Sequence, residues 1–215
     1  SGHSRAIWVI KLNDGYREIL DSIASDSPTP GGGSVAALSL AHAHALVCMV
    51  ARLTLKSSKW ESGHDSATNA LNQSHEGISV AIDLAHRDAE SFDSVILAFK
   101  MPKSTDDEFS QRRSAIARGY LRASEVPMET AETGLILLRN IAKFATNCNA
   151  HAITDIATAA QLAHSSIIIA ALNIKINLTS LDKEESDRMS TNIENIESDG
   201  AGLAEEINMI VASRM

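Results

Sequence analysis

The chain has 215 residues, of which 44% are hydrophobic, 21% are charged and only 4% are aromatic, the composition of a soluble globular protein long enough for one core. Its 27 acidic and 19 basic residues give a net charge of −8, and the lack of a basic cluster argues against a nucleic-acid partner. Cys48 and Cys148 have no metal-ligand spacing, which favours reduced, buried thiols in a cytoplasmic protein.

The two ends of the chain show no targeting signal. Residues 1–3 resemble a cloning remnant, so we expect one domain over residues 4–215 and no signal peptide. The longest charge-free run extends from Ser27 to Ala51. Its apolar part contains Ser39, His42 and His44 and is short for a bilayer, so we expect no membrane span.

Hydrophobic residues recur every three or four positions, which predicts helices over residues 11–25, 35–56, 65–99, 108–123, 124–146, 155–176 and 182–215. Residues 35–56 and 155–176 are nearly uncharged on every side. We therefore expect these two helices to be buried and the amphipathic helices to surround them. No segment alternates with a period of two. The sequence thus predicts an all-α, single-domain helical bundle.

Polar residues and prolines predict where these helices begin and end. Three pairs resemble capping boxes, namely Ser62 with Asp65, Thr105 with Glu108, and Asp182 with Glu185. Because proline is tolerated in a first turn, we expect Ser124 to cap a separate helix that includes Pro127. We also expect a break in the last helix near Gly200.

A loop rich in proline and glycine, Ser27–Ser34, precedes the first apolar helix. Gly31, Gly32 and Gly33 have no side chains, so another backbone or a ligand can come close. A helix that starts at Ser34 would present unpaired N–H groups, which bind anions well. On this pattern alone, a tight packing turn is the more typical interpretation.

Three polar residues in the second apolar helix are candidates for chemistry, because burying them costs free energy unless they are paired or used. Asp155 lies at the start of this helix, where a carboxylate also suits the helix dipole. Asn173 and Asn177 are four residues apart, and an unbroken helix would align all three on one stripe. The aspartate is equally consistent with a first-turn acid, and the asparagines with helix termination.

Asp88 lies within a charged stretch of the long helix, four residues before Phe92, and therefore leans toward the apolar side. The eight histidines do not indicate a metal site. His42 and His44 point to different sides of one helix, and no zinc-site or hydrolase motif occurs. We therefore expect no metal.

Several segments together resemble one known family. They are Pro28–Ser34, Met49–Thr54, Asp88–Phe92 with Phe99–Lys100, Ala123–Met128, Asn149–Asp155 with Ala159–Ala160, and Asn173–Leu178. In this order and spacing the chain is similar to the cyclodeaminase domain of formiminotransferase-cyclodeaminase and to its stand-alone relatives, which include methenyltetrahydrofolate cyclohydrolases. One departure is Cys148-Asn149 where the family usually has Gly-Asn. The formiminotransferase half is absent, so formimino transfer would need a separate protein.

The resemblance implies an all-helical homodimer that binds a tetrahydrofolate derivative near the subunit interface. It implies closure of 5-formiminotetrahydrofolate to 5,10-methenyltetrahydrofolate with loss of ammonia. Asp155 is then the expected acid–base residue, with Asp88 as the second carboxylate or as a ligand of the pterin. The expected substrate-binding residues are Gly31, Gly32, Gly33, Ser34, Lys56, Asn149, Asn173 and Asn177.

Two other functions remain open at this stage. A methenyltetrahydrofolate cyclohydrolase would use the same pocket with water in place of ammonia. A non-catalytic helical dimer would use the glycine- and alanine-rich surfaces for assembly alone, and would bind no folate.

Overall fold

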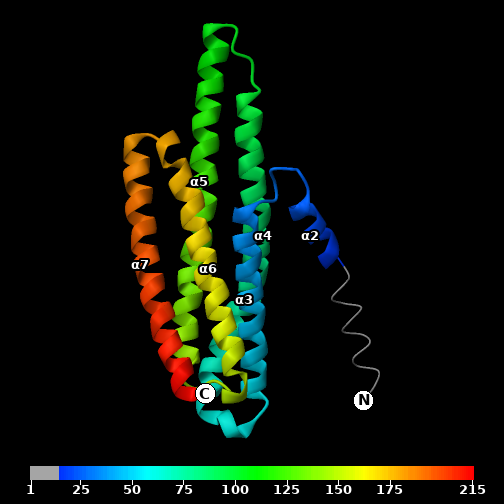
Figure 1. Ribbon diagram of the computed structural model, residues 1–215, viewed down its shortest axis with the longest axis vertical. Helices are drawn as coiled ribbons and strands as arrows, with labels where there is room; N and C mark the ends of the chain where they lie inside the picture. Colours follow the sequence, from blue (N-terminus) through cyan, green and yellow to red (C-terminus); the bar gives the residue numbers. More distant parts are fainter. Residues whose placement is uncertain (1–14) are drawn as a thin grey trace.

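The computed structural model describes residues 15–215, so residues 1–3 and the expected start of the first helix at Lys11 lie outside the described residues. Within residues 15–215 there are six α-helices and no strand, which confirms the all-α prediction. The helices are α2 (Tyr16–Ala24), α3 (Gly32–Leu55), α4 (His64–Phe99), α5 (Asp106–Phe144), α6 (Ile153–Asn177) and α7 (Lys183–Arg214) (Figure 1).

Four helices, α3, α4, α5 and α6, form a bundle in which each packs against two neighbours, and α7 packs along α5 and α6 (Figure 1). The core combines a few large aliphatic side chains with many alanines. Small side chains allow helix axes to come close, so the scarcity of aromatic residues suits this packing. Helix α2 lies at the edge of the bundle and has no buried residue.

The helices predicted over residues 108–123 and 124–146 are wrong as separate elements, because α5 is continuous from Asp106 to Phe144 with Pro127 inside it. Proline removes one helical hydrogen bond and crowds the carbonyl four residues earlier. Buried contacts on both sides of Pro127 nevertheless hold the helix together, including those of Val126 and Ala131. Packing therefore outweighs the local cost of the proline.

Other helix ends agree in part with their predicted signals. Thr105 and Glu108 form the expected capping box of α5, and the Asp182 side chain accepts from the Glu185 N–H at the start of α7. The capping box predicted at Ser62 is wrong, because a 3-10 helix, Ser58–Gly63, leads into α4. Helix α7 also passes through Gly200 without a break.

The two apolar helices, α3 and α6, contribute many buried residues to the core, as predicted, but each keeps one exposed side. By length and composition, α3 and the segment Ala150–Ser180 around α6 could each cross a membrane. The most apolar window of α3 is 61% buried, so its composition is that of a core helix. The corresponding window around α6 is only 44% buried, which leaves apolar surface on this helix.

Helices α4 and α5 extend beyond the other helices as a two-helix hairpin (Figure 1). Its seam is formed by small residues: a Cβ atom on Gly119 of α5 would lie 3.1 Å from the Val95 side chain of α4. Near its tip, the Phe99 and Tyr120 rings meet edge to face, with centroids 6.2 Å apart.

Candidate active site at the start of helix α3

The glycine loop leads directly into the first turn of α3, which begins at Gly32. Gly31 is the N-cap residue and offers no side chain to cap the helix. The first N–H groups of α3 are therefore free for a ligand or water. Thr29 donates a 3.0 Å hydrogen bond to the Asp93 carboxylate, and Ser34 donates a 2.8 Å bond to the Ala85 carbonyl, so the loop is tied to α4 at both ends.

The Asp88 carboxylate of α4 lies directly against Gly33. A Cβ atom at Gly33 would overlap both carboxylate oxygens and the carbon between them, so only glycine fits at this position. Within residues 15–215 the carboxylate makes no hydrogen bond. Burial raises its pKa from 3.8 to about 6. This value makes Asp88 suited to exchange protons near neutral pH.

A cavity of about 160 Å³ opens beside this carboxylate. It is lined by the loop before α3, by α4 on one side and by α5 and α6 on the other, through Pro28, Thr29, Gly31, Gly32, Gly33, Asp88, Ser91, Phe92, Ala123, Asn173, Ile176 and Asn177. Asn173 donates to the Ile169 carbonyl at 3.1 Å, and Asn177 donates to the Ala123 carbonyl at 3.4 Å. One cavity thus brings together the three glycines, Asp88 and both asparagines.

Ser34 does not line this cavity, because its hydroxyl is bonded to the Ala85 carbonyl. The other three predicted residues, Lys56, Asn149 and Asp155, lie at the opposite end of the bundle. Lys56 ends α3 and Asp155 is in the first turn of α6. The Asn149 side chain donates to the Leu53 carbonyl at 3.3 Å and accepts from the His151 N–H. Asp155 and Asn173 share one stripe of the unbroken helix α6, but eighteen residues place them about 27 Å apart. A single chain does not bring these two groups together.

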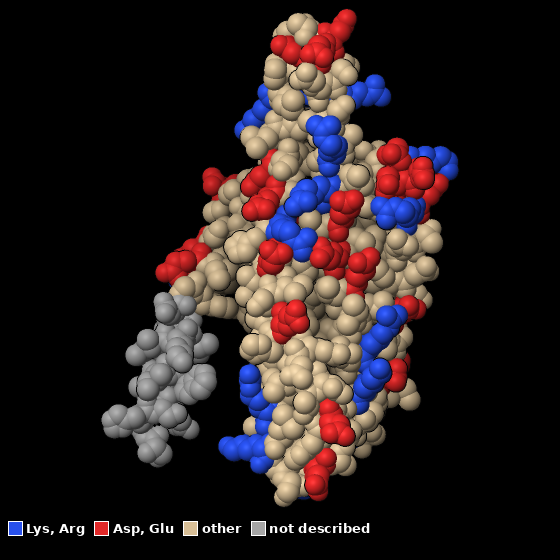
Figure 2. Space-filling view, turned by 180° about the vertical axis from the view of Figure 1, so that it is seen from behind, with Lys and Arg blue, Asp and Glu red and all other residues tan. Residues whose placement is uncertain are grey.

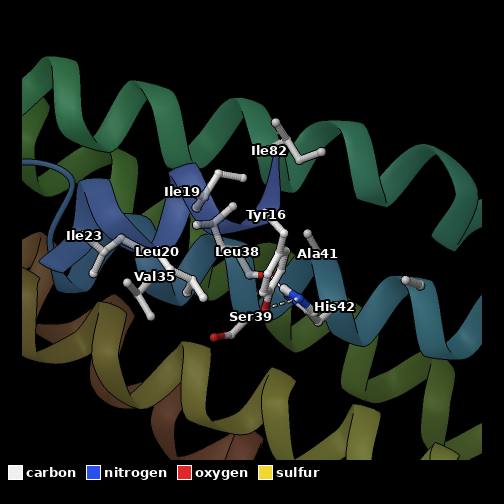
Figure 3. A pocket seen from close by; sticks show the side chains of 11 residues that line it. Tyr16, Ile19, Leu20, Ile23, Val35, Leu38, Ser39, Ala41, His42 and Ile82 are labelled. Carbon is white, nitrogen blue, oxygen red and sulfur yellow. Dashed lines mark hydrogen bonds between the residues drawn. The ribbon is translucent and has the colours of Figure 1, made fainter. Parts of the chain in front are cut away.

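Two larger cavities, of about 390 and 490 Å³, lie under α2 and have almost entirely apolar walls. In the first, the Tyr16 hydroxyl points toward the His42 ring, 3.4 Å from Nε2 (Figure 3). Its other lining residues are mainly aliphatic side chains of α2 and α3. The first cavity has no Asp or Glu in its lining, and the second has only Glu18, which is exposed and not held by burial in the cavity wall as Asp88 is. We therefore place the chemistry at the smaller cavity that contains Asp88.

Within the described residues, no Lys or Arg side chain forms an ion pair with Asp88. Its neighbour Arg87 pairs with Asp83 and, across the helix interface, with Glu129, each at 2.7 Å. Charged side chains of both signs are dispersed over the face of the molecule opposite to Figure 1 (Figure 2). Among residues 15–215 no group of three His, Cys, Asp or Glu side chains could hold a metal ion.

Comparison with known proteins gives a family for this arrangement. The family model described as formiminotransferase-cyclodeaminase matches residues 15–195, which is most of the chain. The chain belongs to this family. The match confirms the resemblance inferred from the sequence segments.

Relatives within the family include both stand-alone and fused proteins. The chain is 29% identical to the methenyltetrahydrofolate cyclohydrolase of Methylorubrum extorquens over 94% of this chain and 98% of that protein. It is 29% identical to the rat formimidoyltransferase-cyclodeaminase over 78% of this chain, but it spans only 31% of that protein. Its fold matches the crystal structure of a formiminotetrahydrofolate cyclodeaminase from Thermotoga maritima with a TM-score of 0.83, 27% identity and 94% and 97% coverage of the two chains.

The departure at Cys148 from the usual family residue, glycine, leaves the local fold intact. No residue other than glycine has a positive φ angle among those described, so position 148 does not require glycine. Burial raises the pKa of the Cys148 thiol. Cys48 and Cys148 are both buried and unpaired, as the sequence predicted.

Sequence reasoning missed six residues that line the cavity of this family member: Pro28, Thr29, Ser91, Phe92, Ala123 and Ile176. Ser91 and Phe92 follow Asp88 by three and four positions on the same helix, so helical spacing could have identified them. Ala123 could have been identified in another way. It precedes Pro127 by four positions, so its carbonyl lacks the usual helical hydrogen bond.

Proposed function

We propose that this family member closes 5-formiminotetrahydrofolate to 5,10-methenyltetrahydrofolate with release of ammonia, at the cavity beside Asp88. The observation that carries the proposal is a single carboxylate with a pKa of about 6, held against the N-terminus of α3 in a cavity with two asparagines. Family membership and the fold shared with a formiminotetrahydrofolate cyclodeaminase support it.

The reaction needs one proton to be moved between two nitrogens. The formimino nitrogen is protonated, and the substrate's N10 attacks the carbon next to it and forms the new N–C bond. The ionised Asp88 carboxylate takes the proton from N10 and gives it to the amino group, which leaves as ammonia while the methenyl C=N bond forms. One group that both accepts and donates a proton is most effective when its pKa lies near the working pH.

The cavity suits the pterin end of such a substrate. Drug-sized ligands fill pockets of roughly 300–1,000 Å³, whereas this cavity holds about 160 Å³. We therefore place the bicyclic ring in the cavity and the rest of the folate on the surface outside it. The free N–H groups of Gly32, Gly33 and Ser34 face ligand atoms that accept hydrogen bonds.

The second candidate, methenyltetrahydrofolate cyclohydrolase, is supported by a relative of that name that matches almost over its whole length. In this reaction Asp88 would activate the water that attacks the methenyl carbon. The two activities differ in whether ammonia leaves or water enters, so the same site serves either.

We also propose that two copies pair through the exposed side of α3 and α6. Neither α3 between Gly32 and Ala51 nor α6 between Ile156 and Ile174 contains a charged residue. On α6, Ile168, Leu172 and Ile176 are 44%, 62% and 76% exposed and lie at four-residue spacing. Large exposed apolar patches mark association surfaces.

An antiparallel pairing of these faces would join the separated site residues. The end of α3 and α6 that carries Lys56, Asn149 and Asp155 in one copy would lie near the Asp88 cavity of the other. Lys56 would then bring a cation to a carboxylate that pairs with none among residues 15–215 of its own chain. This arrangement explains why residues at opposite ends of one bundle serve one reaction.

The deciding experiment offers the purified protein each folate in turn. With 5-formiminotetrahydrofolate we expect ammonia release together with the rise of methenyl absorbance. With 5,10-methenyltetrahydrofolate alone, loss of that absorbance faster than the uncatalysed rate would favour the cyclohydrolase. No turnover of either compound, and no thermal stabilisation by a reduced folate, would leave only the non-catalytic dimer.

A further inference from the structure

Pro127 changes the hydrogen bonding of the wall of the active-site cavity. In a regular helix the N–H of residue 127 would bond the carbonyl of residue 123. Proline has no N–H, so the Ala123 carbonyl loses its helical partner. Ala123 lines the cavity and is only 9% exposed. A buried carbonyl without a partner costs free energy, so it needs another donor.

The structure contains such a donor, but the hydrogen bond that it makes is long. Asn177 reaches from α6 to the Ala123 carbonyl, at 3.4 Å, which is longer than the usual range of about 2.7–3.2 Å for an N–H···O bond. The contact shows that the carbonyl points toward the cavity, because Asn177 lines the same cavity. A carbonyl oxygen has two lone pairs, so Ala123 can accept a second hydrogen bond.

Other polar groups that line the cavity also offer acceptors. Asp88 presents a carboxylate, and Asn173 and Asn177 each donate one of their two amide N–H groups to a backbone carbonyl. Their remaining side-chain oxygens accept hydrogen bonds. The side of the cavity formed by α5 and α6 therefore offers oxygen acceptors to the edge of a ligand that presents N–H donors.

From these contacts we infer that Pro127 is a positioning residue, which frees the Ala123 carbonyl to accept a hydrogen bond from an N–H group of the substrate's aminopyrimidinone ring. This inference rests on the proposed function, because that ring belongs to the folate. It gives a reason for a proline in the interior of α5, where proline is the least favourable residue for a helix.

The first test is Pro127→Ala, assayed with whichever folate the wild type turns over. Alanine restores the N–H that bonds the Ala123 carbonyl within the helix. We expect KM to rise about threefold to tenfold with kcat within about twofold, as for loss of one ground-state hydrogen bond. The thermal midpoint should stay equal or rise, because the helix gains a bond and a better helix former.

Pro102→Ala is the matched control, because Pro102 is exposed in the turn between α4 and α5 and does not line the cavity. We expect its KM and kcat to equal those of the wild type. An unchanged KM in a folded Pro127→Ala variant would overturn the inference. A loss of stability without a rise in KM would do the same, since proline would then be structural only.

The second test observes the carbonyl in the wild-type protein and does not depend on a variant that folds. The sequence contains three Ala–Ser pairs, Ala24–Ser25, Ala123–Ser124 and Ala212–Ser213. Labelling alanine carbonyls with ¹³C and serine nitrogens with ¹⁵N therefore gives three one-bond cross-peaks. On adding 5-formyltetrahydrofolate we expect the Ala123 carbonyl resonance to shift downfield and the other two to stay.

The two proposals fail in distinguishable ways. A wild-type protein that neither turns over nor binds a reduced folate would overturn the proposed function and this inference together. Turnover by the wild type, with an unmoved Ala123 resonance on saturation by 5-formyltetrahydrofolate, would overturn only the role of Pro127 and Ala123.

Discussion

Burial of Asp88 disfavours its ionised form. The activity should therefore depend on pH. Because the carboxylate must be ionised to take the N10 proton, kcat/KM should rise with pH through about 6 and level off above it. Asp88→Asn should lower kcat/KM about 100- to 10,000-fold and abolish this titration. A pH–rate profile from pH 5 to 8 checks both. A profile of the same shape in a still-active variant would assign the titration to another group.

Because of the same burial, the ionised Asp88 carboxylate lowers the free energy of unfolding at neutral pH. Its pKa is about 6 in the folded state against 3.8 ordinarily, so the folded state binds more protons between these values. The free energy of unfolding should therefore fall as pH rises from about 4 to about 6 and then stay level. We expect roughly 1 to 2 kcal/mol after allowing for partial solvent exposure.

Asp88→Asn should remove this pH dependence and be more stable than the wild type at pH 7 by a similar amount. Urea unfolding of both proteins at pH 4, 5, 6 and 7 measures it. If the free energy of unfolding changed equally with pH in the two proteins, the carboxylate would not be buried as described.

Gly33 and Gly32 provide a matched pair for the first turn of α3. A Cβ atom at Gly33 would overlap the Asp88 carboxylate, whereas one at Gly32 would meet nothing within 4 Å. We expect Gly33→Ala to lower kcat/KM at least about tenfold by displacing the carboxylate. Gly32→Ala should leave the carboxylate, and the pH dependence of kcat/KM that it causes, in place, so pH–rate profiles of the two variants under identical conditions separate the close contact from a general effect on the helix start.

At the scale of elements, α3 and α4 approach closely where His44 meets Gly77. The His44 ring is 8% exposed and bonds Ser74 at 3.1 Å, and burial lowers its pKa to about 4. A Cβ atom at Gly77 would overlap that ring. Gly77→Ala should therefore lower the free energy of unfolding by about 1 to 3 kcal/mol.

Gly202 in α7 is the control for this effect, because a Cβ atom there would meet nothing within 4 Å. In an open helical position alanine stabilises by up to about 1 kcal/mol over glycine. Denaturant unfolding should therefore move the two variants in opposite directions. A stabilised Gly77→Ala protein would contradict the close packing of α3 and α4.

The helices were predictable where local chemistry determines them, and less so where packing does. The Thr105 cap and the apolar character of α3 and α6 follow from sequence pattern. The continuity of α5 through Pro127 does not, because it depends on contacts with other helices. In the site, the contact of Gly33 with Asp88 depends on how α3 and α4 are aligned, which spacing along one helix cannot show. Helical spacing correctly placed Asp155 and Asn173 on one face of α6. It did not take into account how far apart they lie along the helix axis.

At the scale of the whole molecule, the proposed pairing predicts complementation between inactive variants. Asp88→Asn and Asp155→Asn would each be inactive alone, because each alters both composite sites of the dimer. In a heterodimer one site carries both substitutions and the other carries none. Mixing the two proteins under conditions of subunit exchange should restore roughly a quarter of wild-type activity.

Light scattering on each variant provides the control, since both must remain dimeric for the mixture to be informative. Two dimeric variants that exchange subunits without regaining activity would place both aspartates in one chain's site, or remove Asp155 from the site altogether.

The active-site cavity lies at the base of the projecting α4–α5 hairpin, between a part of the molecule that should open locally with ease and a part that should not. Beyond the cavity, α4 and α5 are held mainly by each other, whereas below it each packs into the full bundle. Amide hydrogen exchange should therefore be fastest near Phe109 at the tip and slow progressively toward Leu138 in the core. Asp88 and Ala123 lie at the boundary between the fast-exchanging hairpin and the slow-exchanging bundle. A bound substrate that bridges α4 and α5 would therefore slow exchange in the hairpin without touching its tip.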